Sequence, residues 1–170
     1  MRNLFYLTIF VLAVGFVYVG TGLGSDASVQ ASKLWSSMQD ARYQDNWALW
    51  PGKGKLYKGT HPHGALLTTY INEVAANALK AGAKEMPKGS IIIKENYMPG
   101  ETLGAITVMD KAGEGKDDYF WVKYTPDGTV AVKEIEKDGK KMSVTLAGKP
   151  KGCIGCHVAS TGGIYNIMTR

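Results

Sequence analysis

Residues 90–124 read SIIIKENYMPGETLGAITVMDKAGEGKDDYFWVKY and hold three runs rich in β-branched and aromatic residues. Glycine and proline separate the runs, so the sequence predicts strands over residues 90–97, 103–109 and 119–124. Sequential strands joined by short turns favour an antiparallel sheet. This segment is expected to form the centre of the fold.

The flanking residues add helices and shorter strands. Leu66–Ile71 is a further predicted strand that stops at Asn72, a good N-cap for a helix over residues 73–80 that Gly82 closes. Further expectations are a short helix from Ser32 to near Tyr43, a loop over residues 57–64, a strand over 129–135 after a Pro-Asp-Gly turn, and a short strand over 144–146. The predicted class is α+β, an antiparallel β-sheet with flanking helices.

Composition limits the class of protein. The chain has 170 residues, which suits one domain, and 45% hydrophobic with 21% charged residues exclude a disordered chain. The net charge of +5 comes from scattered lysines without a basic–aromatic platform, so we expect a solvated surface and no nucleic-acid partner. A sharper alternative, less favoured, is that Lys149 and Lys151 steer an acidic partner.

The N-terminus has the layout of an export segment. Arg2 precedes the uncharged stretch from Leu4 to Gly24, a positive start followed by a hydrophobic run. Small residues before Ser32 fit cleavage, but the stretch is also close to the ~20 residues that span a bilayer. We therefore expect residues 1–31 to be a signal peptide or membrane anchor, and residues 32–170 to be periplasmic, soluble or tethered to the inner membrane.

Both cysteines fall in one motif, Cys153-Ile154-Gly155-Cys156-His157. C-x-x-C-H is the attachment signature of c-type haem, in which two thiols bond to the haem and the histidine ligates the iron. A disulfide would not need His157, and a thioredoxin-like pair would follow the first strand of a βαβ unit. Zinc bound with His61 or His63 would have a spacing unlike a standard finger. One covalent haem c, with His157 as the metal ligand, is therefore predicted.

The sixth iron ligand is the next question. His61 and His63 flank Pro62 in a glycine-bounded loop, where histidines are usually surface or hydrogen-bonding residues. Met98, in a predicted loop, is the best methionine candidate. We expect an open or apolar sixth site.

The region from Trp47 to His157 resembles the cytochrome P460 family, which includes the cytochromes c′-β. The resemblance is carried by residues 64–72 (GALLTTYIN), 89–95 (GSIIIKE) and 119–124 (YFWVKY), and by the late C-x-x-C-H. It implies a largely antiparallel β protein, often a homodimer, with one c-type haem and a gas-accessible distal site. The P460 enzymes oxidise hydroxylamine and carry a lysine cross-linked to haem, whereas c′-β members bind nitric oxide and related gases.

The resemblance also implies roles for individual residues. The strand lysine of the enzymes falls on Lys94, while their distal arginine falls on Leu67, and residues 146–148 lack the carboxylate that some members place there. A pocket lined by Leu67, Tyr70 and Phe120 would favour small neutral diatomics.

Three functions are therefore expected for the chain. The first is a haem protein that binds nitric oxide or a related nitrogen oxide and works with a periplasmic redox partner. The second is an oxidoreductase that acts on hydroxylamine or nitric oxide. The third is a six-coordinate electron carrier.

Overall fold

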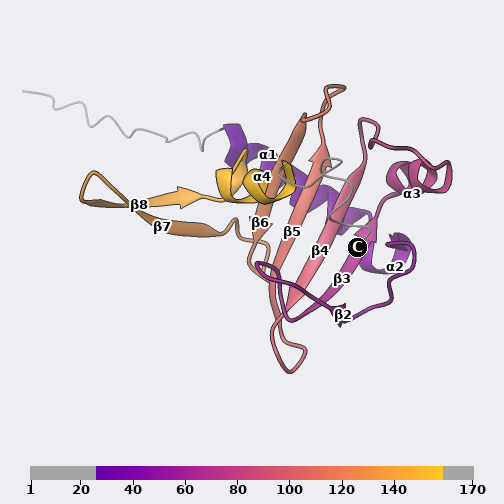
Figure 1. The fold of residues 1–170 in the computed structure, drawn as a ribbon, viewed down its shortest axis with the longest axis horizontal. Helices are drawn as coiled ribbons and strands as arrows, with labels where there is room; N and C mark the ends of the chain where they lie inside the picture. Colours follow the sequence, from indigo (N-terminus) through magenta and orange to yellow (C-terminus); the bar gives the residue numbers. More distant parts are fainter. Residues whose placement is uncertain (1–25, 159–170) are drawn as a thin grey trace, which may run out of the picture.

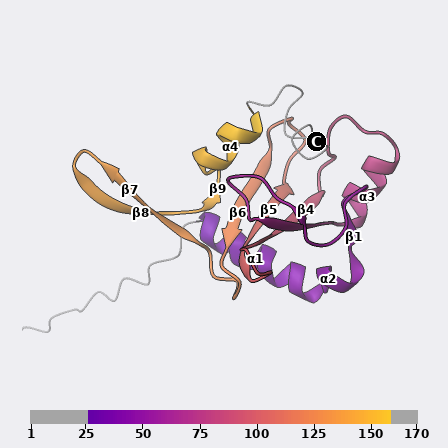
Figure 2. The same cartoon turned by 60° about the horizontal axis from the view of Figure 1, so that its bottom comes forward.

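A computed structural model describes residues 26–158, which form a main sheet with helices on both of its faces and a separate two-stranded hairpin (Figures 1 and 2). The predicted export segment, residues 4–24, lies outside the described part of the chain. No helix among the described residues is long and apolar enough to cross a membrane. The helices are α1 (Asp26–Asp40), α2 (Tyr43–Asn46), α3 (Glu73–Lys80) and α4 (Lys151–Val158).

The main sheet is antiparallel throughout, with the order β1-β3-β4-β5-β6-β9, and β2 also pairs with β3. The strands are β1 (Ala48–Leu49), β2 (Tyr57–Lys58), β3 (Leu66–Ile71), β4 (Ile91–Tyr97), β5 (Leu103–Lys111), β6 (Tyr119–Tyr124), β7 (Val132–Lys137), β8 (Lys140–Thr145) and β9 (Ala147–Gly148). The predicted α+β class with an antiparallel sheet is confirmed, and β4 to β6 are its centre.

Local signals located several elements correctly. The side chain of Asn72 accepts a hydrogen bond from the backbone N–H of Ala75, so it is the N-cap of α3.

The strand expected over residues 129–135 begins later, at Val132. The backbone N–H of Thr125 donates instead to the carbonyl of Thr129, which keeps Thr129 in the turn.

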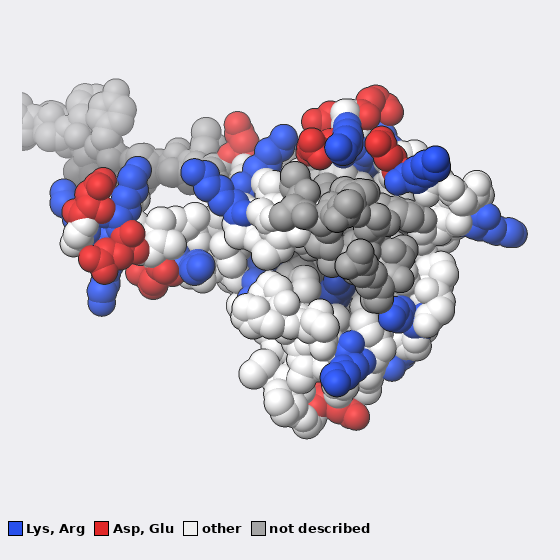
Figure 3. All heavy atoms as spheres, viewed as in Figure 1, with Lys and Arg blue, Asp and Glu red and all other residues white. Residues whose placement is uncertain are grey.

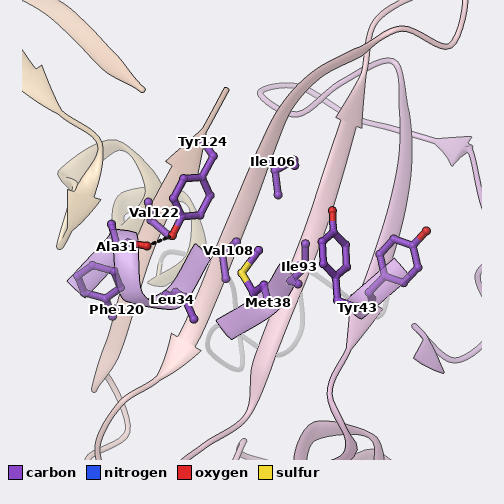
Figure 4. Close-up of a cluster of buried hydrophobic side chains, with 11 residues drawn as sticks. Ala31, Leu34, Met38, Tyr43, Ile93, Ile106, Val108, Phe120, Val122 and Tyr124 are labelled. Carbon is purple, nitrogen blue, oxygen red and sulfur yellow. Dashed lines mark hydrogen bonds between the residues drawn. The ribbon is translucent and has the colours of Figure 1, made fainter. Parts of the chain in front are cut away.

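Helix α1 covers one face of the sheet, called here the α1 face (Figure 4). Ala31, Leu34 and Met38 on α1 pack against apolar residues of the central strands. The sheet and α2 side of this core consists of Tyr43, Tyr70, Ile93, Ile106, Val108, Phe120, Val122 and Tyr124. The hydroxyl of Tyr124 donates a hydrogen bond of 2.7 Å to the Ala31 carbonyl, which ties α1 to β6.

Helix α1 lies across the position predicted for signal-peptide cleavage. Helix α1 runs across the predicted cleavage position between residues 31 and 32, and Ala31 is fully buried. The folded unit therefore includes residues 26–31, and a cut before Ser32 would remove part of the core.

Glu95 is a fully buried carboxylate on the α1 face. Its Oε1 accepts hydrogen bonds from the Tyr43 hydroxyl (2.9 Å) and from Nε2 of Gln44 (2.6 Å). Its Oε2 accepts one from the Tyr97 hydroxyl (2.7 Å). Three donors thus replace the water that the carboxylate loses on burial.

Strands β7 and β8 form a separate hairpin that projects from the main sheet (Figure 1). Nearly all of its side chains are exposed, including Val132, Met142 and Val144. Charges of both signs lie side by side on the hairpin (Figure 3). The hairpin therefore contributes little to the hydrophobic core.

Candidate functional site

The C-x-x-C-H motif lies on α4, over the face of the sheet opposite α1, called here the α4 face (Figure 2). The carbonyl of Pro150 accepts hydrogen bonds from the backbone N–H groups of Cys153 (3.0 Å) and Ile154 (3.2 Å), which starts the helix. Residues three and four positions apart lie on the same side of a helix. Helix α4 therefore presents Cys153, Cys156 and His157 together.

These three side chains differ in burial. Both cysteines are free; Cys153 is half-buried and Cys156 is exposed. Cys153 packs with Ile154 against the apolar cluster of the α4 face, and burial raises the pKa of its thiol. His157 is buried, with only 6% of its surface exposed. The motif is thus held against the sheet on one side and open to solvent at Cys156.

The His157 imidazole lies between aromatic and basic groups. Its ring centre is 4.7 Å from that of Trp121 on β6 and 6.3 Å from that of His63. Burial, followed by the charge of Lys94 and then the proximity of His63, lowers the pKa of His157 to about 4. At neutral pH the imidazole is therefore uncharged, the form that ligates metals.

Strand β4 places Lys94 on the same face of the sheet, close enough for its charge to act on His157. Lys94 pairs with Thr69 on β3 and Thr107 on β5, and it is 8% exposed. Burial lowers its pKa to about 8 because the charged ammonium is poorly solvated there. Burying a lysine in the middle of a sheet lowers the stability of the fold. The α4 face therefore differs from an ordinary hydrophobic core, in which lysine is rarely buried.

The loop before β3 brings His63 to this face. The backbone N–H of Gly59 donates to the carbonyl of Ala65 (2.8 Å), which closes the loop. A Cβ on Gly64 would clash with the Tyr97 carbonyl oxygen, so the loop fits tightly against the end of β4 only with glycine there. Nδ1 of His63 then lies 2.8 Å from Oδ1 of Asn96.

The structure brings together most, but not all, of the predicted site residues. Lys94 lies on the α4 face with the motif, and Leu67, which pairs with Asn96 in register, is buried on the same face. Tyr70 and Phe120 are on the α1 face, inside the core under α1. The expectation that these two aromatic residues line the pocket with Leu67 is wrong, because alternate residues of a strand point to opposite faces.

Two residues near the motif were not anticipated from the sequence. Trp121 contacts His157, and Asn96 holds His63. The period of two in a strand would have identified Asn96 once Lys94 had been assigned to the site, and Trp121 once Phe120 had been excluded. Their role was hidden because the sequence does not say which face of the sheet α4 covers.

The residues present fit a covalently attached haem. Two free thiols and a neutral imidazole share one side of α4, and the face of the sheet that α4 covers also carries the buried polar side chains Thr69, Lys94 and Asn96. Among residues 26–158, no three side chains of His, Cys, Asp or Glu form a group able to hold a metal ion by themselves.

Comparison of the chain with protein-family models, with curated proteins and with solved structures found no match.

Proposed function

We propose that the chain is a periplasmic monohaem c-type cytochrome whose distal position binds small nitrogen oxides such as nitric oxide. The observation that carries the proposal is the C-x-x-C-H motif on one side of α4, above a sheet face with buried polar groups. When bound, the haem supplies an iron centre that takes up a diatomic ligand and exchanges electrons with a partner.

The chain's own residues have distinct tasks in this proposal. Cys153 and Cys156 would hold the haem through thioether bonds, and His157 would supply a nitrogen ligand to the iron. Trp121 packs against the His157 ring and limits its rotation. Leu67, which is 4% exposed, keeps the surrounding surface dry and favours an uncharged diatomic over hydrated ions.

The test uses the full chain, produced in a host that attaches c-type haem in the periplasm. We expect a protein whose mass includes one haem after denaturation, and whose reduced absorption spectrum changes when nitric oxide is added. The Cys153→Ala/Cys156→Ala double variant is the control and should lose the haem on denaturation. A wild-type chain recovered from that host without covalent haem would contradict the proposal.

A second candidate is an oxidoreductase that acts on hydroxylamine or nitric oxide. It is favoured by Lys94, which lies buried on the α4 face with a lowered pKa and so gives up its proton more readily than an exposed lysine. A neutral amine is a nucleophile that could bond to a porphyrin carbon during turnover with an oxidant, which would take up the two electrons while two protons are released. Against it, Leu67 stands where the resemblance implies an arginine, and Ala147 packs toward the α1 core.

Peptide mapping separates the two candidates. In the enzyme, a tryptic peptide containing Lys94 would be joined through haem to the peptide containing Cys153 and Cys156. We expect that join to be absent, because Leu67 and Ala147 stand where the resemblance implies an arginine and a carboxylate that would help remove protons from hydroxylamine. Its presence in the isolated protein would move the assignment to the hydroxylamine-oxidising class.

A further inference from the structure

The orientation of the Asn96 amide is set by its neighbours. Asn96 is 6% exposed, and its Nδ2 donates hydrogen bonds to the backbone carbonyls of Lys94 (2.8 Å) and Ala105 (3.2 Å). Carbonyl oxygens only accept, so the group facing them must be the NH₂. The Oδ1 atom, which also only accepts, therefore faces His63.

This orientation determines the tautomer of His63. Nδ1 of His63, 2.8 Å from Oδ1 of Asn96, must carry the proton, since an amide oxygen cannot donate one. In the neutral ring, the lone pair is then on Nε2. Histidines that ligate metals are typically held in this way, with the other ring nitrogen donating to an oxygen acceptor.

The distance between the His63 and His157 rings suits two histidines that ligate the same metal ion. An imidazole ring centre lies about 3.1 Å from a metal ion that the ring ligates, because such metal–nitrogen bonds are about 2.0–2.1 Å long. Two rings on opposite sides of one ion therefore have centres about 6.2 Å apart. The centres of the His63 and His157 rings are 6.3 Å apart, with the ring planes at 87°.

The loop geometry makes this placement specific. The carbonyl of Thr60 accepts a hydrogen bond from the backbone N–H of His63 (3.0 Å), and Gly64 allows the loop to touch β4. His61, two residues earlier in the same loop, is exposed. The two histidines are therefore not equivalent, and only His63 is directed to the α4 face.

We propose that His63 is the resting sixth ligand of the haem iron, held by Asn96, and that an incoming nitrogen oxide must displace it. This inference rests on the proposed haem and adds a means of regulating access to it. The expected open sixth site is thereby replaced by one that is closed until a ligand competes with His63. The fraction of molecules with His63 dissociated then limits the apparent affinity for the gas.

The test compares four haem-loaded full-length proteins: wild type, His63→Ala, His61→Ala and Lys94→Met. Absorption and electron paramagnetic resonance spectra report the spin state, and carbon monoxide serves as the probe ligand. We expect low-spin spectra for the wild type, His61→Ala and Lys94→Met. His63→Ala should be high-spin and bind carbon monoxide about tenfold faster or more, and added imidazole should restore its low-spin spectrum.

Each other outcome is decisive. A high-spin wild type, which needs no variant to observe, would overturn the role of His63 while leaving gas binding at the haem intact. A low-spin His63→Ala protein would do the same. A change of spin state in Lys94→Met alone would assign the sixth position to the lysine. A chain without covalent haem would refute both this inference and the proposed function.

Discussion

The two faces of the central sheet differ in how their buried polar groups are stabilised, although β4 contributes side chains to both faces. On the α1 face, Ile93 is fully buried among apolar residues, and the buried Glu95 has three hydrogen-bond donors. On the α4 face, Lys94 is buried with its pKa lowered, beside two imidazoles.

The contrast separates stability from function. A face on which every buried polar group is satisfied, as around Glu95, contributes to folding. Burying an ionisable group such as a lysine lowers the stability of the fold, so a face that does so is expected to have a function. Clusters of residues with shifted pKa values mark candidate functional sites. Substitutions on the α1 face should therefore change stability alone, whereas substitution of His63 on the α4 face should change the haem spectrum.

Ile93→Ala should give the largest effect. The side chain is fully buried in the α1-face core, so its truncation should lower the free energy of unfolding by about 4 kcal/mol through lost burial and a new cavity. Denaturant titration measures the loss. The haem spectrum of the folded variant should match that of the wild type, and a change of spin state would break the proposed division between the faces.

A chain that begins at Ser32 should be less stable than one that begins at Asp26, by about 3 kcal/mol. It loses the buried Ala31 and the acceptor of the Tyr124 hydroxyl, and a buried donor left unsatisfied costs about 1–3 kcal/mol alone. Tyr124→Phe isolates the hydrogen bond and should cost about 1 kcal/mol. N-terminal sequencing of the purified protein should accordingly find no start at Ser32.

Lys94→Met should act in the opposite direction and stabilise the haem-free chain. The pKa of Lys94 is lowered from 10.5 to about 8, a shift equivalent to about 3 kcal/mol. Below pH 8 both the folded and the unfolded chain carry the charge, and the burial cost is fully present. Between pH 8 and 10.5 the folded chain alone has lost the proton, so wild-type stability should rise with pH and approach that of the variant.

Denaturant unfolding of the wild type and of Lys94→Met at several pH values checks this expectation. Lys133→Met, on the exposed hairpin, is the matched control and should show no such pH-dependent difference. Equal stability of wild type and Lys94→Met from pH 7 to 10.5 would mean that Lys94 reaches solvent.

Met142→Ser should have the smallest effect. The side chain is 48% exposed on the β7–β8 hairpin, outside both apolar clusters, so the free energy of unfolding should change by less than about 0.5 kcal/mol. Thermal unfolding of the variant beside Ile93→Ala measures this. A loss of stability close to that of Ile93→Ala would show that the hairpin is packed against a partner in solution.

Local patterns in the sequence were sufficient to predict most of the helices and strands. The bounds of β3 and α3 match the predicted ranges, since alternation, β-branched residues and the Asn72 cap act over a few residues. The part of α1 before Ser32 was not predicted, because the signal-like composition of the first residues was given precedence over the helix that crosses residue 31.

The C-x-x-C-H motif was evident from the sequence because its chemistry depends on spacing within one helical turn. Which side chains surround it depends on the face of the sheet that α4 covers, and a strand pattern is the same for either choice. Tyr70 and Phe120 were therefore assigned to the site although they belong to the α1 core, and Trp121 and Asn96 were overlooked. Only packing, which joins α4 to residues more than thirty positions away, brought His63, Asn96 and Lys94 to the same face of the sheet as His157.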